Sequence, residues 1–187
     1  MHFIFLDNTI NFTSSSLNLK ALDYHQKSII HFTEELVKIG HQVTVYNNTE
    51  IEKNIEGVNW KNINRAEKIK MIADVIIVCN DENLLDLNLE AKLKLFWMKS
   101  FNNLNDYKNI LIKLMKYKFI ILYNSDFLIS SLPENFKYIP KIPMLLGVSK
   151  QYFEDKNFNI TKCQALVTVH PLRGIDWLVD VWINSIS

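Results

Sequence analysis

The feature that most constrains the fold is a set of short apolar, β-branched runs without regular polar alternation. Asp74–Cys79 (DVIIVC) and Lys118–Tyr123 (KFIILY) are the clearest of them. A strand in the interior of a parallel sheet is covered on both faces, so its sequence is apolar almost throughout, whereas a half-exposed strand alternates. These two runs therefore predict buried strands of a parallel sheet with helices on both sides.

A helical pattern separates the first two predicted strands, His2–Leu6 and Gln42–Tyr46. Over Leu19–Ile39, apolar residues recur at spacings of three and four, which is the period of one helix face. Gly40 follows, where a glycine commonly ends a helix. The predicted face is formed by Leu22, His25, Ile29, Phe32, Leu36 and Ile39. Strand, helix and strand within about 45 residues leave room for a parallel βαβ unit.

The alternation of strands and helices continues along the chain, which predicts an α/β fold with a Rossmann-like, open, mainly parallel sheet flanked by helices. A polar loop without periodicity is expected at Asp7–Asn18. Further strands are predicted at Gly57–Ile63, Asp74–Cys79, Lys92–Met98 and Lys118–Tyr123, and helices at Ala66–Ile72, about Asp106–Met115 and Asp126–Ser131; Ile139–Pro143 is interrupted by proline and is assigned to neither class.

Composition excludes several classes of function. The 21 Lys and Arg residues balance 20 Asp and Glu residues, which argues against a nucleic-acid binder that relies on bulk charge. Cys79 and Cys163 form neither a disulfide framework nor a metal-ligand spacing, so no metal site is predicted. No apolar run is long enough to span a membrane, and the first residues lack the basic region of a signal peptide. A cytoplasmic protein with reduced thiols is expected.

Ligands of open α/β sheets bind beyond the carboxyl ends of the strands, so the loops there are the candidate sites. The hydroxyls of Thr13, Ser14, Ser15 and Ser16 are available to a ligand, although a solvated polar loop is the plainer reading. Lys99 directly follows a predicted strand and is either an anion-binding cation or a surface lysine. The sequence contains no GxGxxG, GxxxxGK[ST], HExxH or GxSxG motif.

The segment HPLRG lies between a predicted strand, Leu166–Val169, and an apolar helical segment. A helix N-terminus offers free N–H groups and positive potential, and an arginine adds a bidentate fork, so Arg173 and Gly174 form a plausible phosphate site. A structural turn is the alternative. The histidines of the first helix, His25 and His31, are predicted to pack or to face solvent rather than to act in catalysis.

Several segments together resemble the GT-B glycosyltransferases of the family 4 (group 1) type. HFTEELVKIGHQVTVYN is similar to the first helix and second strand of that family, and HPLRGIDWLVDVW is similar to the segment that opens its nucleotide-sugar half. Five further segments between these two occur in the order of the family's later strands and loops: GVNW, ADVIIVCN, KLKLFWMKS, YNSDFLISSLP and YIPKIPMLLGVSKQYF. Lys99 stands where the family often has a histidine, and Ser14–Ser16 replace its usual Gly-Gly.

The resemblance implies an acceptor-side Rossmann-like domain at residues 1–160, with residues 161–187 as the first strand and helix of a donor-binding domain. Because that helix has an apolar face formed by Trp177, Leu178, Val181 and Trp182, we expect it to dock on the first domain or to pair between two chains. Arg173 would contact the diphosphate of a nucleotide-sugar donor, and no cofactor is implied. The family's acidic E-x7-E motif would lie beyond Ser187. Two readings stay open: half of a transferase that needs a separately encoded donor-binding half, or a non-catalytic binding module. A homodimer through the C-terminal helix is a further expectation.

Overall fold

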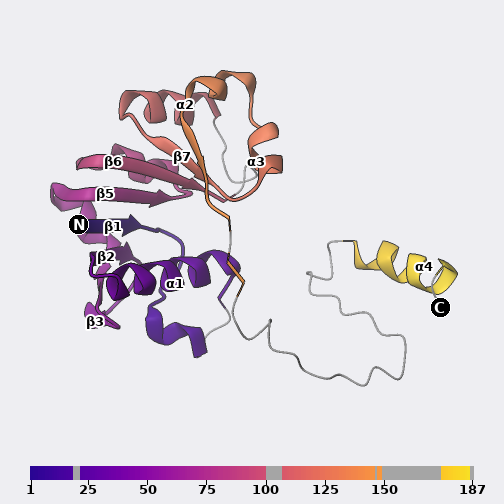
Figure 1. Ribbon diagram of the computed structural model, residues 1–187, viewed down its shortest axis with the longest axis horizontal. Coiled ribbons are helices and arrows are strands. Elements are labelled where there is room, and N and C mark those ends of the chain that lie inside the picture. Colours follow the sequence, from indigo (N-terminus) through magenta and orange to yellow (C-terminus); the bar gives the residue numbers. More distant parts are fainter. Residues whose placement is uncertain (19–21, 100–106, 146, 149–173, 186–187) are drawn as a thin grey trace. The chain divides into compact units, whose positions relative to one another are not determined.

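The computed structural model describes residues 1–18, 22–99, 107–145, 147–148 and 174–185. These residues belong to two compact units, Met1–Gly147 and Val148–Ser187. The first unit contains the sheet and almost all of the described helices (Figure 1). The second contains one described helix, at Ile175–Ser185.

The first unit is built on an eight-stranded sheet in the order β3-β4-β2-β1-β5-β6-β7-β8. Its pairs are parallel except β3 with β4, which are antiparallel. The predicted α/β class with a Rossmann-like, mainly parallel open sheet is therefore confirmed. The strands are β1 (His2–Leu6), β2 (Gln42–Asn47), β3 (Lys53–Ile55), β4 (Val58–Asn62), β5 (Met71–Cys79), β6 (Leu89–Met98), β7 (Ile120–Tyr123) and β8 (Lys141–Pro143).

The strand order reverses direction between β1 and β5. From β1 the chain moves outward to β2 and β4, and it then returns to place β5 on the other side of β1. Such a reversal leaves a crevice at the carboxyl ends of the two strands, because the connections leave in opposite directions. Leu6 is paired with Val78, so the residues that follow, Asp7 and Cys79, lie side by side at this edge.

Alternate side chains of each strand enter one of two hydrophobic layers. On β1, Phe3 and Phe5 pack in the layer beneath α1 (Tyr24–Lys38), whereas Ile4 and Leu6 pack in the layer of α2 (Tyr107–Lys116). Complete burial of a side chain such as Phe5 contributes about 1.5–3 kcal/mol. Both faces of the central strands are therefore apolar, as their uninterrupted sequences indicate.

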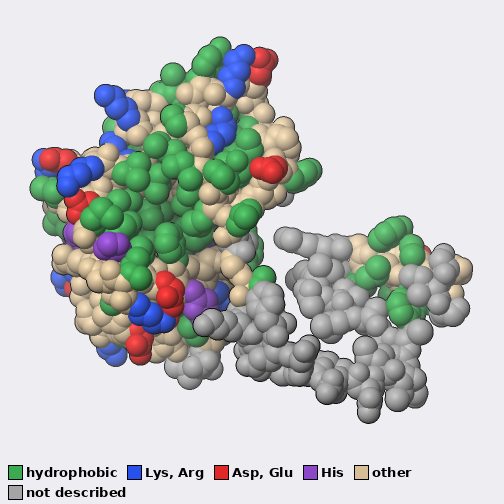
Figure 2. All heavy atoms as spheres, in the orientation of Figure 1, with side chains coloured by type: hydrophobic (Ala, Val, Ile, Leu, Met, Phe, Trp, Pro, Cys, Tyr) green, Lys and Arg blue, Asp and Glu red, His purple; other side chains and the backbone are tan. Residues whose placement is uncertain are grey.

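The half of the sheet formed by β5, β6 and β7 also carries hydrophobic side chains at its surface (Figure 2). On β6 and β7, Leu93 and Ile120 are only partly buried although they belong to the layer of α1. The crossovers that follow β5 and β6 run through η3 (Glu82–Asp86) and α2, both of which pack in the opposite layer. Among the described residues, this part of the α1 face consequently has less cover.

Helix α1 begins later than the sequence predicts. Its first residue is Tyr24 rather than Leu19, because Asp23 adopts an extended backbone and caps the helix with its side chain. The end is as predicted, with Gly40 at a φ of 88°. Ile39 is the C-cap residue and is 68% exposed, so its expected place on the buried face is wrong.

The predicted helix at Ala66–Ile72 is also wrong. A 3₁₀ helix, η2 (Ile63–Lys68), stands there, and Met71 already belongs to β5. Asn62 caps η2 by accepting a hydrogen bond from the N–H of Asn64 at 2.9 Å. The early start of β5 reflects its ladder with β6, where Met71 pairs with Leu89. The short antiparallel strand β3 was not predicted.

The remaining helices of the first unit are short. Helix α3 (Asp126–Ser130) is close to its predicted range, and η4 (Glu134–Tyr138) precedes β8. In the second unit, Gly174 precedes α4 (Ile175–Ser185). The predicted strand Leu166–Val169 lies outside the described residues. No helix in the described parts of the chain is long and apolar enough to cross a membrane.

Candidate functional site

The carboxyl ends of β1, β5 and β6 bring together polar side chains from four separate segments. Three of them directly follow strands: Asp7 follows β1, Asn80 follows β5 and Lys99 follows β6. The fourth, Asp23, is the N-cap residue of α1. Two contacts join these segments directly: the N–H of Lys99 donates to Asn80 Oδ1 at 2.8 Å, and Lys99 Nζ forms an ion pair with Asp23 Oδ2. This edge lies at the strand-order reversal and is the candidate site.

A capping box fixes the N-terminus of α1 over this edge. Asp23 Oδ1 accepts hydrogen bonds from the N–H groups of His25 and Gln26 at 2.8 and 3.2 Å, and Gln26 Oε1 accepts from the N–H of Asp23 at 3.1 Å. The side-chain amide of Gln26 extends this hydrogen-bond network to the loop after β1, because its Nε2 donates to Thr9 Oγ1 at 3.2 Å. Thr9 Oγ1 in turn donates to Asp7 Oδ1. The network ties the helix to the loop after β1.

Lys99 lies at the carboxyl end of its strand, as the sequence predicts, but its charge is already neutralised. Its Nζ is paired with Asp23 and lies 5.1 Å from the centre of the Tyr24 ring. Burial raises the pKa of Asp23, but Lys99 and the capped N–H groups outweigh burial and hold that pKa below its ordinary value. An anionic ligand at Lys99 would therefore have to displace a capping carboxylate.

Asp7, His25 and Cys79 form a buried cluster beneath this network. Their exposed fractions are 0%, 2% and 1%, and one potential ligand atom of each lies within 4.8 Å of those of the other two. Asp7 Oδ2 and His25 Nε2 are 3.8 Å apart, which is too long for a hydrogen bond. Within the described residues neither of these two buried atoms has a hydrogen-bond partner.

Burial controls protonation in this cluster. It lowers the pKa of His25 to about 4, with a further contribution from the positive charge of Lys99. Burial also raises the pKa of Asp7 and raises that of the Cys79 thiol well above its ordinary value. At neutral pH the histidine is consequently an uncharged imidazole, the form that binds a metal ion.

The predicted serine loop forms a short 3₁₀ helix, η1 (Ser14–Asn18), and most of its polar groups bind each other. The N–H of Thr13 donates to Ser16 Oγ at 3.0 Å, and Thr13 Oγ1 lies 2.9 Å from Ser15 Oγ. Ser14 and Ser16 are buried, whereas Ser15 is exposed. Ser15 is therefore the serine of this group that a ligand can reach without rearrangement.

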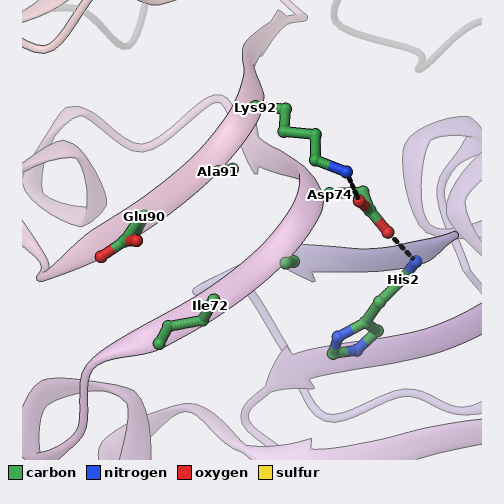
Figure 3. A pocket seen from close by; sticks show the side chains of 7 residues that line it. His2, Ile72, Asp74, Glu90, Ala91 and Lys92 are labelled. Carbon is green, nitrogen blue, oxygen red and sulfur yellow. Dashed lines mark hydrogen bonds and ion pairs between the residues drawn. The ribbon is translucent and has the colours of Figure 1, made fainter.

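A shallow cavity of about 490 Å³ lies at the opposite, amino-terminal edge of the sheet (Figure 3). Its charged groups already have partners: Asp74 Oδ1 accepts from Lys92 Nζ at 2.6 Å, Asp74 Oδ2 accepts from the N–H of His2 at 2.8 Å, and Glu90 forms an ion pair with Lys70. Lys92 holds the pKa of Asp74 below its ordinary value. Because ligands of this fold class bind at the other edge, this cavity is not the candidate site.

The sequence predicts Lys99 at this edge but gives no indication of the buried cluster. His25 is packed in the core, which is one of the two placements predicted for it, and Cys79 is a buried free thiol. The available signal was an acidic residue directly after a buried strand and a cysteine at the last position of another. Arg173 lies outside the described residues, and Gly174 is exposed beside α4.

Comparisons of the chain with protein-family models, with curated proteins and with solved structures yield no significant match.

Proposed function

We propose that residues 1–147 form the acceptor-side domain of a glycosyltransferase-like protein that handles nucleotide-diphosphate sugars. The observation that carries the proposal is the strand-order reversal between β1 and β5, with a lysine at the end of the neighbouring strand β6. In open α/β sheets this place binds ligands. The segments that resemble the GT-B enzymes, among them GHQVTVYN at the end of α1 and in β2, support the same function.

The charges suggest how a donor would be held. Lys99 would exchange its partner Asp23 for an anionic group of a ligand. By resemblance to the family, Arg173 is assigned to the donor diphosphate, as a separate role in the second unit. A fixed cation stabilises the charge that develops on a leaving diphosphate, which is the main requirement for sugar transfer by this route. The exposed hydroxyl of Ser15 is available to an acceptor sugar.

Calorimetry with UDP- and GDP-sugars on the full chain tests this proposal. We expect binding that Arg173→Ala weakens by about tenfold or more, since a lost charged hydrogen bond costs about 1.5–3 kcal/mol. Lys99→Ala should also weaken binding. Lys92→Ala is the matched control, because Lys92 is likewise paired with an aspartate but lies at the opposite edge. No heat at millimolar ligand, or equal binding by the Arg173 variant, would refute the donor site.

A non-catalytic, self-associating module is the second candidate, favoured by the surface of α4. Three apolar residues of α4, Trp177, Val179 and Ile183, have exposed fractions of 68%, 48% and 60%. An apolar surface of this kind favours association with another protein chain or with a second copy. Light scattering across a concentration series decides: a dimer that Trp177→Ser together with Ile183→Ser converts to a monomer supports it, and a monomer at every concentration contradicts it.

A further inference from the structure

We propose that Asp7, His25 and Cys79 bind a single transition-metal ion, with Zn²⁺ as the ion that suits them best. The three side chains come from the end of β1, the first turn of α1 and the end of β5. The proposal does not depend on the sugar-transferase function, and no motif spacing in the sequence indicates it.

The geometry of the cluster fits a small ion after a modest contraction. Zinc binds sulfur at about 2.3 Å and nitrogen or oxygen at about 2.0–2.2 Å, so tetrahedral ligands lie about 3.3–3.7 Å from one another. The ligand atoms here all lie within 4.8 Å of one another, and the carboxylate and imidazole atoms are 3.8 Å apart. Small rotations about side-chain bonds bring the three atoms to ligand distances.

The hydrogen bonds leave free the atoms that a metal ion would need. Asp7 Oδ1 accepts from the N–H of Thr9 at 3.0 Å and from its hydroxyl, which orients the carboxylate, while Oδ2 is buried without a partner among the described residues. His25 Nε2 is likewise buried and unpaired there, and its ring is held edge-on against Trp97 at 4.9 Å. Two unpaired buried polar atoms facing each other cost stability unless a third group satisfies both.

The kinds of atom select the class of ion. A thiolate and an imidazole favour Zn²⁺ and neighbouring transition metals over Mg²⁺ and Ca²⁺, which prefer oxygen ligands. Three protein ligands leave a fourth position of a tetrahedral ion for water or another ligand. On binding, the metal forms bonds to sulfur, nitrogen and oxygen, and the thiol proton of Cys79 passes to solvent together with any proton held by Asp7.

Cobalt substitution gives a direct test in a chain that keeps all three ligands. Cys163→Ser removes the only other thiol of the sequence. Addition of Co²⁺ to this variant should produce a thiolate-to-cobalt charge-transfer band at one equivalent per chain, with intense visible bands that indicate four-coordinate cobalt. Because Cys79 is then the only thiol, the band assigns the ligand without any substitution in the core. Absence of the band with saturating Co²⁺ would overturn the proposal.

Zinc affinity tests the other two ligands. In a competition assay with a chromogenic chelator, Asp7→Asn should weaken binding of Zn²⁺ by about 10-fold or more and His25→Phe by about 100-fold, since each removes one of three ligands. His31→Asn is the matched control, because His31 is exposed on the same helix. Circular dichroism establishes that each variant is folded. Equal zinc affinity in all folded variants would place the ion elsewhere and refute the site.

Discussion

The buried imidazole of His25 should make the metal-free protein less stable in mild acid. Its pKa is 6.5 in the unfolded chain and about 4 in the folded protein, chiefly because burial opposes the charged form. The unfolded state therefore binds the proton more tightly. The free energy of unfolding is therefore highest, as far as His25 is concerned, above the unfolded pKa, and it falls progressively as the pH drops from 6.5 towards 4. His25→Phe removes the titrating group while keeping an aromatic ring against Trp97.

The size of the effect follows from the two pKa values. At pH 5 the unfolded imidazole is almost fully protonated and the folded one about one-tenth protonated; relative to the uncharged imidazole, protonation therefore favours the unfolded state over the folded state by a factor of about 30. That factor corresponds to about 2 kcal/mol, most of which is lost between pH 7 and pH 5. Asp7 acts in the opposite sense, since its raised pKa makes the folded state bind a proton more tightly at low pH.

Urea unfolding at a series of pH values, with a chelator present, measures the difference between the parent chain and His25→Phe. Because Asp7 titrates in both proteins, the difference in their unfolding free energies isolates His25. We expect that difference to change by about 2 kcal/mol in favour of the variant from pH 7 to pH 5. Parallel curves for the parent and His25→Phe would show that the imidazole does not remain neutral in the folded protein.

Three further substitutions test other parts of the structure by urea unfolding at neutral pH. Asp23→Ala removes the N-cap of α1 and should lower the free energy of unfolding by about 0.5–2 kcal/mol; an unchanged midpoint would show that the cap is dispensable. Gly57→Ala should cost more than Gly40→Ala although both glycines have a positive φ, because the added Cβ would lie 2.5 Å from Val37 Cγ1 at position 57 and in open space at position 40. Equal losses would contradict this packing. Phe5→Ala should cost about 3–5 kcal/mol, since the ring is fully buried between β1 and α1, and a loss below about 1 kcal/mol would argue against that burial.

The apolar runs predicted the central strands well because burial on both faces leaves a direct trace in the sequence. Asp74–Cys79 lies within β5, and the last four residues of Lys118–Tyr123 form β7. The error at Ala66–Ile72 arose where pairing partners outside the segment decide its structure: β5 extends to Met71 because β6 offers a partner there. The 3₁₀ spacing of the buried residues Ile63 and Ala66 also resembles one turn of an α-helix.

The candidate site was predictable only in part. Placing Lys99 at the end of a strand requires local pattern alone, but its pairing with Asp23 depends on how α1 crosses the sheet. The buried cluster depends on strand order, because Asp7 and Cys79 become neighbours only when β5 pairs with β1. A single sequence contains no direct signal for that choice, so the cluster emerges from the fold rather than from a motif.

The position of β1 at the centre of the sheet has a consequence for synthesis of the chain. Strand β1 pairs on one side with β2 and on the other with β5, so Phe3 has both strand partners only after Val43 and Val75 have been synthesised. While only the segment as far as β4 has emerged from the ribosome, one side of β1 presents unpaired N–H and C=O groups flanked by apolar side chains. Such an open edge is a template for pairing with another chain, and the emerging protein is most prone to aggregation until β5 has been made.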